Sequence, residues 1–177
     1  MKFFEAFPYK ETIDVTEGAE AIDFFVQWLY TPGRFFKVPE IKTVLELWLF
    51  AEKIKCTKLQ NYSMNFIQKY YSQNDEFMGL VDLEYVAGTT KHEHGELNIL
   101  REFCALQLHY QNVKGDDDFV REALLHSSDI IVLYLEYEAV YCLDTESDPR
   151  CRIITSPCRF HVHYSNKDRE DCQLKLE

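Results

Sequence analysis

The chain has 177 residues, of which 46% are hydrophobic and 28% charged, so it can bury one ordinary core. It carries 19 basic and 30 acidic residues, and the resulting net charge of −11 opposes non-specific binding to nucleic-acid phosphates and to anionic membranes. Its 6 cysteines are too few for a disulfide scaffold, and neither a signal peptide nor a membrane-spanning run is visible. We therefore expect a cytoplasmic or nuclear protein that binds neither nucleic acid nor membrane.

Hydrophobic periodicity predicts a mainly α-helical chain, with one exception near the N-terminus. Residues 12–15 (TIDV) alternate between apolar and polar side chains, which favours a short strand. The first helix is predicted to be capped by Thr16 and to end near Tyr30, because Pro32 and Gly33 follow. Its buried stripe is predicted from residues that recur with the helical period: Ile22, Phe25, Val26 and Leu29.

Six further helices are expected along the rest of the chain. The spacing of Thr57 and Gln60 is that of a capping box, and Ser127 or Ser128 can cap the last helix. The predicted helices run from Pro39 to Ile54, from the capping box to Tyr71, from about Asp75 to Ala87, from about Glu96 to His109, from Asp116 to His126 and from Asp129 to Tyr141. From residue 144 onward the sequence is polar and contains several Cys and His residues.

The first helices carry a characteristic order of motifs. The first ends in Leu29-Tyr30-Thr31, the second contains Leu45, Leu47, Trp48, Phe50, Ala51 and Lys53, and the third contains Leu59 and Asn61. This order closely resembles the BTB/POZ domain family. Residues 85–90 (YVAGTT) and 157–164 (PCRFHVHY) are similar to segments of its fungal branch.

The resemblance implies a fold class and three regions. Residues 1–72 are expected to form the C-terminal part of an α+β BTB/POZ-like domain, with a short N-terminal strand followed by helices. Residues 73–143 are expected to form a helical extension, and residues 144–177 a polar tail. A complete BTB domain begins with further strands and helices before Met1, so we expect a truncated domain. Without this part, the apolar stripes of the first helices have no surface to pack against. We therefore expect the isolated chain to be marginally stable or to self-associate.

The resemblance also implies a non-catalytic protein–protein interaction module, such as a scaffold or adaptor, with a protein partner of unknown identity. In BTB proteins that scaffold a cullin ubiquitin ligase, the loop after the Leu-Tyr-Thr helix contributes to the cullin contact. Phe35 and Phe36 in this loop are therefore the candidate partner-binding residues, with burial in the core as the competing interpretation.

Other groupings of chemically active residues favour ordinary structural roles. Trp28 and Trp48 have apolar neighbours at helical spacing, which predicts core packing in preference to a ligand groove. Cys104 and His109 lie on one predicted helix but point in different directions, so they do not form a nucleophile–base pair. Lys91-His92-Glu93-His94 is predicted to be a polar loop. No phosphate-binding loop, nucleophile elbow or HExxH motif occurs, so no enzyme is expected.

The tail offers one candidate metal site. Cys158, His161, His163 and Cys172 supply two thiolates and two imidazoles, the ligand types that zinc prefers, and Cys151 is a reserve ligand. The tail has too few apolar residues to fold alone, so a zinc ion is one source of order for it. This observation supports a second hypothesis, a zinc-stabilised binding module in which the tail carries the function. The competing interpretation is a polar tail with scattered Cys and His residues.

Overall fold

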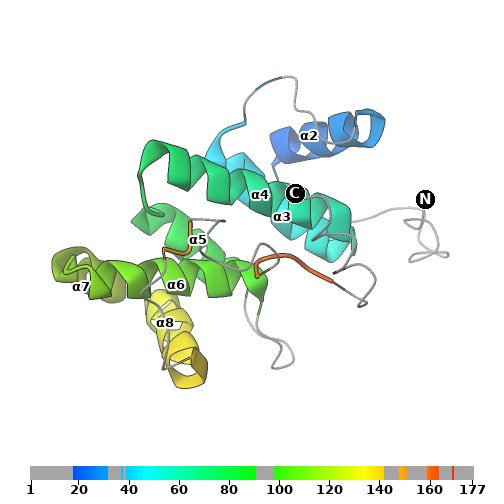
Figure 1. Ribbon diagram of the computed structural model, residues 1–177. Coiled ribbons are helices and arrows are strands. Elements are labelled where there is room, and N and C mark those ends of the chain that lie inside the picture. The colour runs from blue at the N-terminus through cyan, green and yellow to red at the C-terminus, as the bar shows by residue number, and fades with distance from the viewer. Residues whose placement is uncertain are drawn as a thin grey trace. The chain divides into compact units, whose positions relative to one another are not determined.

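The computed structural model describes residues 18–31, 37, 39–90, 98–141, 148–150, 159–163 and 169. In these residues the chain is mainly α-helical, as predicted, and contains seven helices and no strand (Figure 1). They are α2 (Ala19–Tyr30), α3 (Ile41–Lys53), α4 (Thr57–Asn74), α5 (Leu80–Thr89), α6 (Ile99–Val113), α7 (Asp117–His126) and α8 (Ser128–Tyr141). The strand predicted at residues 12–15 lies outside the described residues.

The chain divides into two compact units, and the boundary falls inside α4 between Ile67 and Gln68. In the described residues, the first unit holds α2, α3, the N-terminal part of α4 and the segment His161–His163. The second unit holds the end of α4, helices α5 to α8, and residues 148–150 and 159–160. The C-terminal region therefore contributes residues to both units.

The first unit is organised around the contact between α2 and α3 (Figure 1). Its core consists of Phe24, Leu47, Ala51 and Leu59, with Phe25, Trp28, Cys56 and Tyr62 packed against them. Trp48 is also buried, so the prediction that both tryptophans are core residues is confirmed. Burial of these large side chains removes apolar surface from water and is the main source of stability available to this unit.

The buried stripe that we predicted on α2 was wrong for Val26 and Leu29. The structure buries Ala21 and Phe24, whereas Val26 and Leu29 are 44% and 39% exposed. The ring of Phe25 lies at the edge of the core and meets Phe50 edge to face at 5.0 Å. Because apolar residues occupy most positions of α2, its periodicity fits two registers, and packing on α3 selects the one centred on Phe24.

The start of α2 also differs from the prediction that Thr16 caps it. Gly18 is the N-cap, and its backbone N–H donates to Glu46 Oε2 of α3 at 3.1 Å. Glu20 in the first turn accepts a hydrogen bond from Thr43 Oγ1 of α3 at 3.0 Å. Carboxylates are favourable at a helix N-terminus because the helix dipole is positive there. The carboxylate of α3 therefore replaces the predicted side-chain cap.

Three helices end in the same backbone motif, with a residue of positive φ just beyond the helix. These residues are Lys55 after α3, Asp75 after α4 and Gly115 after α6, with φ values of 54°, 53° and 88°. In each case the next backbone N–H donates to a carbonyl five residues earlier, which satisfies an orphan carbonyl of the last turn. The prediction that a helix begins at about Asp75 was therefore wrong, since this residue terminates α4 and α5 begins at Leu80.

The predicted capping box at the start of α4 was wrong by one residue. The N–H groups of Leu59 and Gln60 both donate to the carbonyl of Cys56 at 3.0 Å, so Cys56 occupies the position expected for Thr57. By contrast, α7 and α8 begin as predicted, with Asp117 and Asp118 in the first turn of α7. The N–H of Asp129 donates to Ser127 Oγ at 3.3 Å, which caps α8.

Helix α6 is the centre of the second unit and packs against α5, α7 and α8. Leu100, Phe103, Cys104 and Leu108 recur on one face of this helix, and all four are fully buried. The other side is also covered in the middle of the helix, because Ala105 and Leu106 are buried as well. A helix covered on all sides is typical of the middle of a helical unit.

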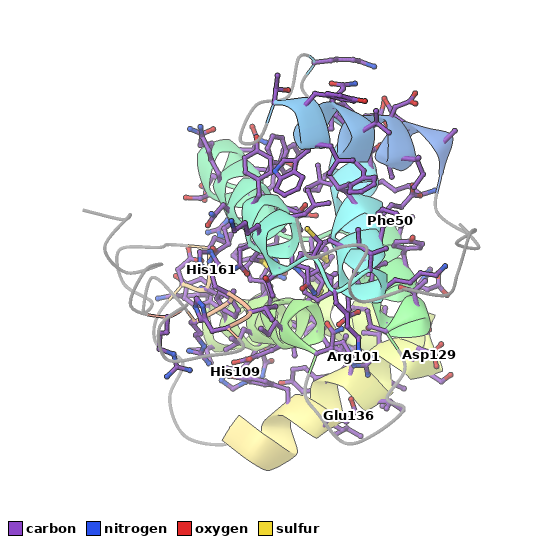
Figure 2. All side chains as sticks on the ribbon, turned by 90° about the vertical axis from the view of Figure 1, so that its right-hand side faces the viewer. Phe50, Arg101, His109, Asp129, Glu136 and His161 are labelled. Atoms are coloured by element: carbon purple, nitrogen blue, oxygen red, sulfur yellow. The ribbon has the colours of Figure 1, made fainter. Side chains whose placement is uncertain are left out.

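The buried guanidinium of Arg101 links three helices of this unit. Its Nη2 donates to Glu136 Oε2 of α8 at 2.8 Å. Its Nη1 donates to the carbonyl of Ala87 in α5 at 2.9 Å and to Thr90 Oγ1 at 3.3 Å. Figure 2 shows Arg101 and Glu136 next to each other. The Nη1 hydrogen bond satisfies a carbonyl in the last turn of α5.

Candidate functional site

The segment His161–His163 is held on the surface of α4 by side chains of that helix. Asn61 forms two hydrogen bonds with the backbone of Val162: Oδ1 accepts from the N–H at 2.7 Å, and Nδ2 donates to the carbonyl at 3.1 Å. One amide side chain therefore satisfies both polar groups of a residue that is 101 positions away in the sequence. This arrangement resembles the pairing of a peptide with the edge of a sheet, with a side chain in place of the neighbouring strand.

The imidazole of His161 makes the second contact with α4. Its Nε2 lies 2.8 Å from Asn65 Oδ1, and the residue is only 5% exposed (Figure 2). Because a carboxamide oxygen only accepts hydrogen bonds, Nε2 carries the proton in this pair. Asn61 and Asn65 are four residues apart, so they lie on the same face of α4. We call this face, defined by Asn61 and Asn65, the asparagine clamp.

The structure bears on half of the predicted zinc ligands. The rings of His161 and His163 lie close together, with their centroids 6.1 Å apart. Cys158 and Cys172 lie outside the described residues, and no group of three or more possible metal ligands occurs within the described part of the chain. Since Nε2 of His161 faces Asn65, a metal ion would be bound through Nδ1. The zinc site stays a prediction.

Residues 148–150 of the tail make contacts that the sequence did not indicate. Arg150 donates to Asp148 through Nε and Nη2, with the shortest distance 2.7 Å, and to the carbonyl of Glu76 at 2.9 Å. Its guanidinium also lies over the ring of Phe77, 3.8 Å from the centroid. The Asp148 hydrogen bonds raise the pKa of Arg150, which remains a cation. Contacts with the loop between α4 and α5 therefore hold residues 148–150 in place.

Phe160 and Arg159 make the corresponding contacts with α6 in the second unit. The ring of Phe160 is buried and meets Phe103 edge to face at 5.1 Å. Arg159 Nε donates to Glu102 Oε1 at 3.3 Å. Burial raises the pKa of Glu102 above its ordinary value, and the opposing effect of Arg159 reduces this rise.

The predicted partner-binding residues Phe35 and Phe36 lie outside the described residues, as does the His92-x-His94 motif. The helix that precedes Phe35 is described, and it exposes a group of large apolar side chains. Tyr30 is 83% exposed, and Val26 and Leu29 lie on the same side of α2. Sequence reasoning missed this face because it assigned Val26 and Leu29 to the core.

Cys104 is a core residue of the second unit. Its side chain is fully buried, and burial raises the pKa of its thiol far above the ordinary value, with a smaller opposing effect from Arg101. Such a thiol does not supply the thiolate that a nucleophilic cysteine needs. His109 lies on the same helix and packs near Tyr137, with 6.2 Å between the ring centroids.

Comparisons with known proteins assign no family to this chain. No protein-family model matches it, and neither the curated proteins nor the solved structures give a significant match. None of the helices in the described ranges has both the length and the apolar character needed to cross a bilayer.

Proposed function

We propose that this chain is a non-catalytic protein–protein interaction module of BTB/POZ type, which acts as a scaffold or adaptor. The observation that carries the proposal is the exposed apolar face of α2, formed by Val26, Leu29 and Tyr30. The last two belong to the Leu-Tyr-Thr motif on which the resemblance to the BTB/POZ family depends.

The chemistry of this face suits a protein partner. Tyrosine is enriched among residues that dominate binding energy, because its ring buries a large area at a small cost in conformational entropy. Exposed apolar side chains gathered on one helix face are typical of interaction sites. The net charge of −11 opposes a polyanionic partner, so the proposal includes no nucleic-acid binding. Phe35 and Phe36, which follow α2 in the sequence, are proposed to extend the same surface.

The test is quantitative affinity purification with the full chain and with a Val26→Ser/Tyr30→Ser variant. Loss of the Val26 and Tyr30 side chains is expected to reduce capture of a specific protein at least about tenfold. This corresponds to a loss of about 1.4 kcal/mol of binding free energy. The matched control is Leu125→Ser, because Leu125 is 79% exposed on α7 and the substitution has the same chemistry. A second variant, Phe35→Ala/Phe36→Ala, tests the loop.

The proposal fails if the α2 variant retains every protein that the unaltered chain captures. It also fails if the chain binds DNA or RNA at submicromolar concentration in a salt-sensitive manner, because phosphate binding produces this dependence. Circular dichroism of each variant establishes that the helices are retained.

A second candidate is a zinc-stabilised binding module in which the tail carries the function. The proximity of the His161 and His163 rings favours this candidate, since imidazoles that share one zinc must lie near each other. Metal analysis of protein purified without a His tag tests it. One zinc per chain that is lost in Cys158→Ser and in Cys172→Ser supports the site, and protein free of zinc after purification in zinc-containing buffer refutes it.

A further inference from the structure

The asparagine clamp binds His161–His163 through contacts that a separate peptide can also make. Both hydrogen bonds of Asn61 are with backbone atoms of Val162. Main-chain contacts do not depend on the side chain at that position, so an extended segment of different sequence can form them. The clamp therefore provides the main-chain hydrogen bonds that a general peptide site requires.

A peptide site also requires selectivity for a particular side chain. Asn65 Oδ1 accepts a hydrogen bond from the His161 imidazole, which is almost completely buried. A site built to bond a buried polar group rejects ligands that lack it, because its own polar group then loses its partner. The clamp thus selects a histidine that directly precedes the residue whose backbone Asn61 binds.

We propose that the asparagine clamp is a recognition site for an extended peptide segment of a partner protein, with a histidine followed by an apolar residue. In this chain His161–His163 occupies the site and competes with the partner. The inference rests on the proposed protein-binding function and adds the chemistry of the segment that is bound.

The exposed face of α2 explains how a partner segment can displace the one already present. A segment of the same chain has the advantage of a high effective concentration. Helix α2 and the clamp belong to the same compact unit. A partner that is held at Val26, Leu29 and Tyr30 therefore has its own segment tethered to the unit that contains the clamp, which raises the effective concentration of that segment.

The experiment uses a synthetic peptide with the sequence of residues 159–165 (RFHVHYS) and measures its affinity for the full chain. The His161→Ala variant weakens the internal occupant but retains Asn61 and Asn65. We expect it to bind the peptide at least about tenfold more tightly than the unaltered chain does. Replacing the first histidine of the peptide by alanine is expected to weaken binding about tenfold, and adding Asn61→Ala to the variant is expected to remove it.

The matched control is His126→Ala, which removes an imidazole that contacts Glu84 in the second unit. It is expected to bind the peptide no better than the unaltered chain. Equal affinity for all three proteins, or a folded His161→Ala variant that does not bind the peptide, overturns the proposal. An affinity that is insensitive to Asn61→Ala does so as well.

A second measurement keeps the test decisive if His161→Ala does not fold. Millimolar peptide added to the isotopically labelled, unaltered chain is expected to accelerate hydrogen exchange at the Val162 amide about tenfold, whereas the alanine-substituted peptide is not. Unchanged exchange overturns the proposal. The Val26→Ser/Tyr30→Ser variant distinguishes failure of this proposal from failure of the proposed protein-binding function. It tests capture of a partner through α2, and it leaves the clamp and its affinity for the isolated peptide unaltered.

Discussion

The Arg101 ion pair provides the sharpest prediction for stability. In Arg101→Met the carboxylate of Glu136 and the carbonyl of Ala87 both lose the hydrogen bond from Arg101, while most of the side-chain volume is kept. Removing one partner of a buried ion pair costs about 3–5 kcal/mol. The Arg101 side chain is 6% exposed but that of Glu136 is 33% exposed, so water compensates part of the loss and the expected cost is about 3 kcal/mol.

Thermal unfolding followed by circular dichroism measures this cost. For a chain of this length, about 3 kcal/mol corresponds to a fall in Tm of about 6–12 °C. The control is Lys37→Met, which breaks the exposed pair between Lys37 Nζ and Glu20 Oε1 at 3.4 Å. Exposed pairs contribute little, so its Tm is expected to stay within about 2 °C of the unaltered chain.

A double variant tests the reason for the effect. Arg101→Met combined with Glu136→Leu removes both charges of the pair, so the carboxylate that loses Arg101 is removed together with it. It is expected to be more stable than Arg101→Met alone, because replacing a whole ion pair by apolar residues costs less than breaking it. The reasoning is refuted if Arg101→Met and Lys37→Met have the same Tm, or if the double variant is less stable than both single variants.

Three further predictions concern helix ends, pH and metal. Lys55 and Gly115 both have positive φ, a conformation that glycine adopts more easily than other residues. Lys55→Gly is therefore expected to raise the free energy of unfolding by about 1 kcal/mol, and Gly115→Ala is expected to lower it by about 1 kcal/mol. Urea denaturation measures both changes, and two shifts of the same sign contradict the argument. Glu102 has a raised pKa in the folded state, so its contribution to stability is present at low pH and is lost as the pH rises through that pKa. In Glu102→Gln the Tm is therefore expected to fall less with rising pH just above the pKa of an unfolded glutamate, even though the substitution weakens the contact with Arg159. An unaltered Tm–pH profile refutes this prediction. If the tail binds zinc, a chelator is expected to lower the Tm of the unaltered chain but not that of Cys158→Ser.

Local features of the sequence predicted those parts of the fold that local interactions determine. The acidic residues before Phe119 and the hydroxyl of Ser127 act within one turn, so the starts of α7 and α8 were predicted correctly. The end of α4 was not, because Asn74 and Asp75 are polar residues that fit either a helix or its termination. The choice depends on the left-handed backbone of Asp75, and the apolar pattern carries no signal for it.

Long-range pairing limited what could be predicted of the candidate site. His161 and His163 were grouped as candidate zinc ligands, and their rings lie close together because two residues separated by one in an extended stretch lie on the same side. The partner of His161 is Asn65, which is 96 residues away, and no local pattern connects them. Asn61 was noted only as part of the family motif and Asn65 was not noted at all, because asparagine is common on helix surfaces and neither residue indicated a contact with Val162 or His161.

The distance in sequence between Asn61 and Val162 has a consequence for how the protein is synthesised. Ribosomes add about 5–20 residues per second, so the 101 positions that separate these residues take roughly 5–20 seconds to translate. Helices themselves form within microseconds. During this interval α4 can already be helical while its clamp has no internal occupant, and a nascent chain presents the open site that the finished protein covers.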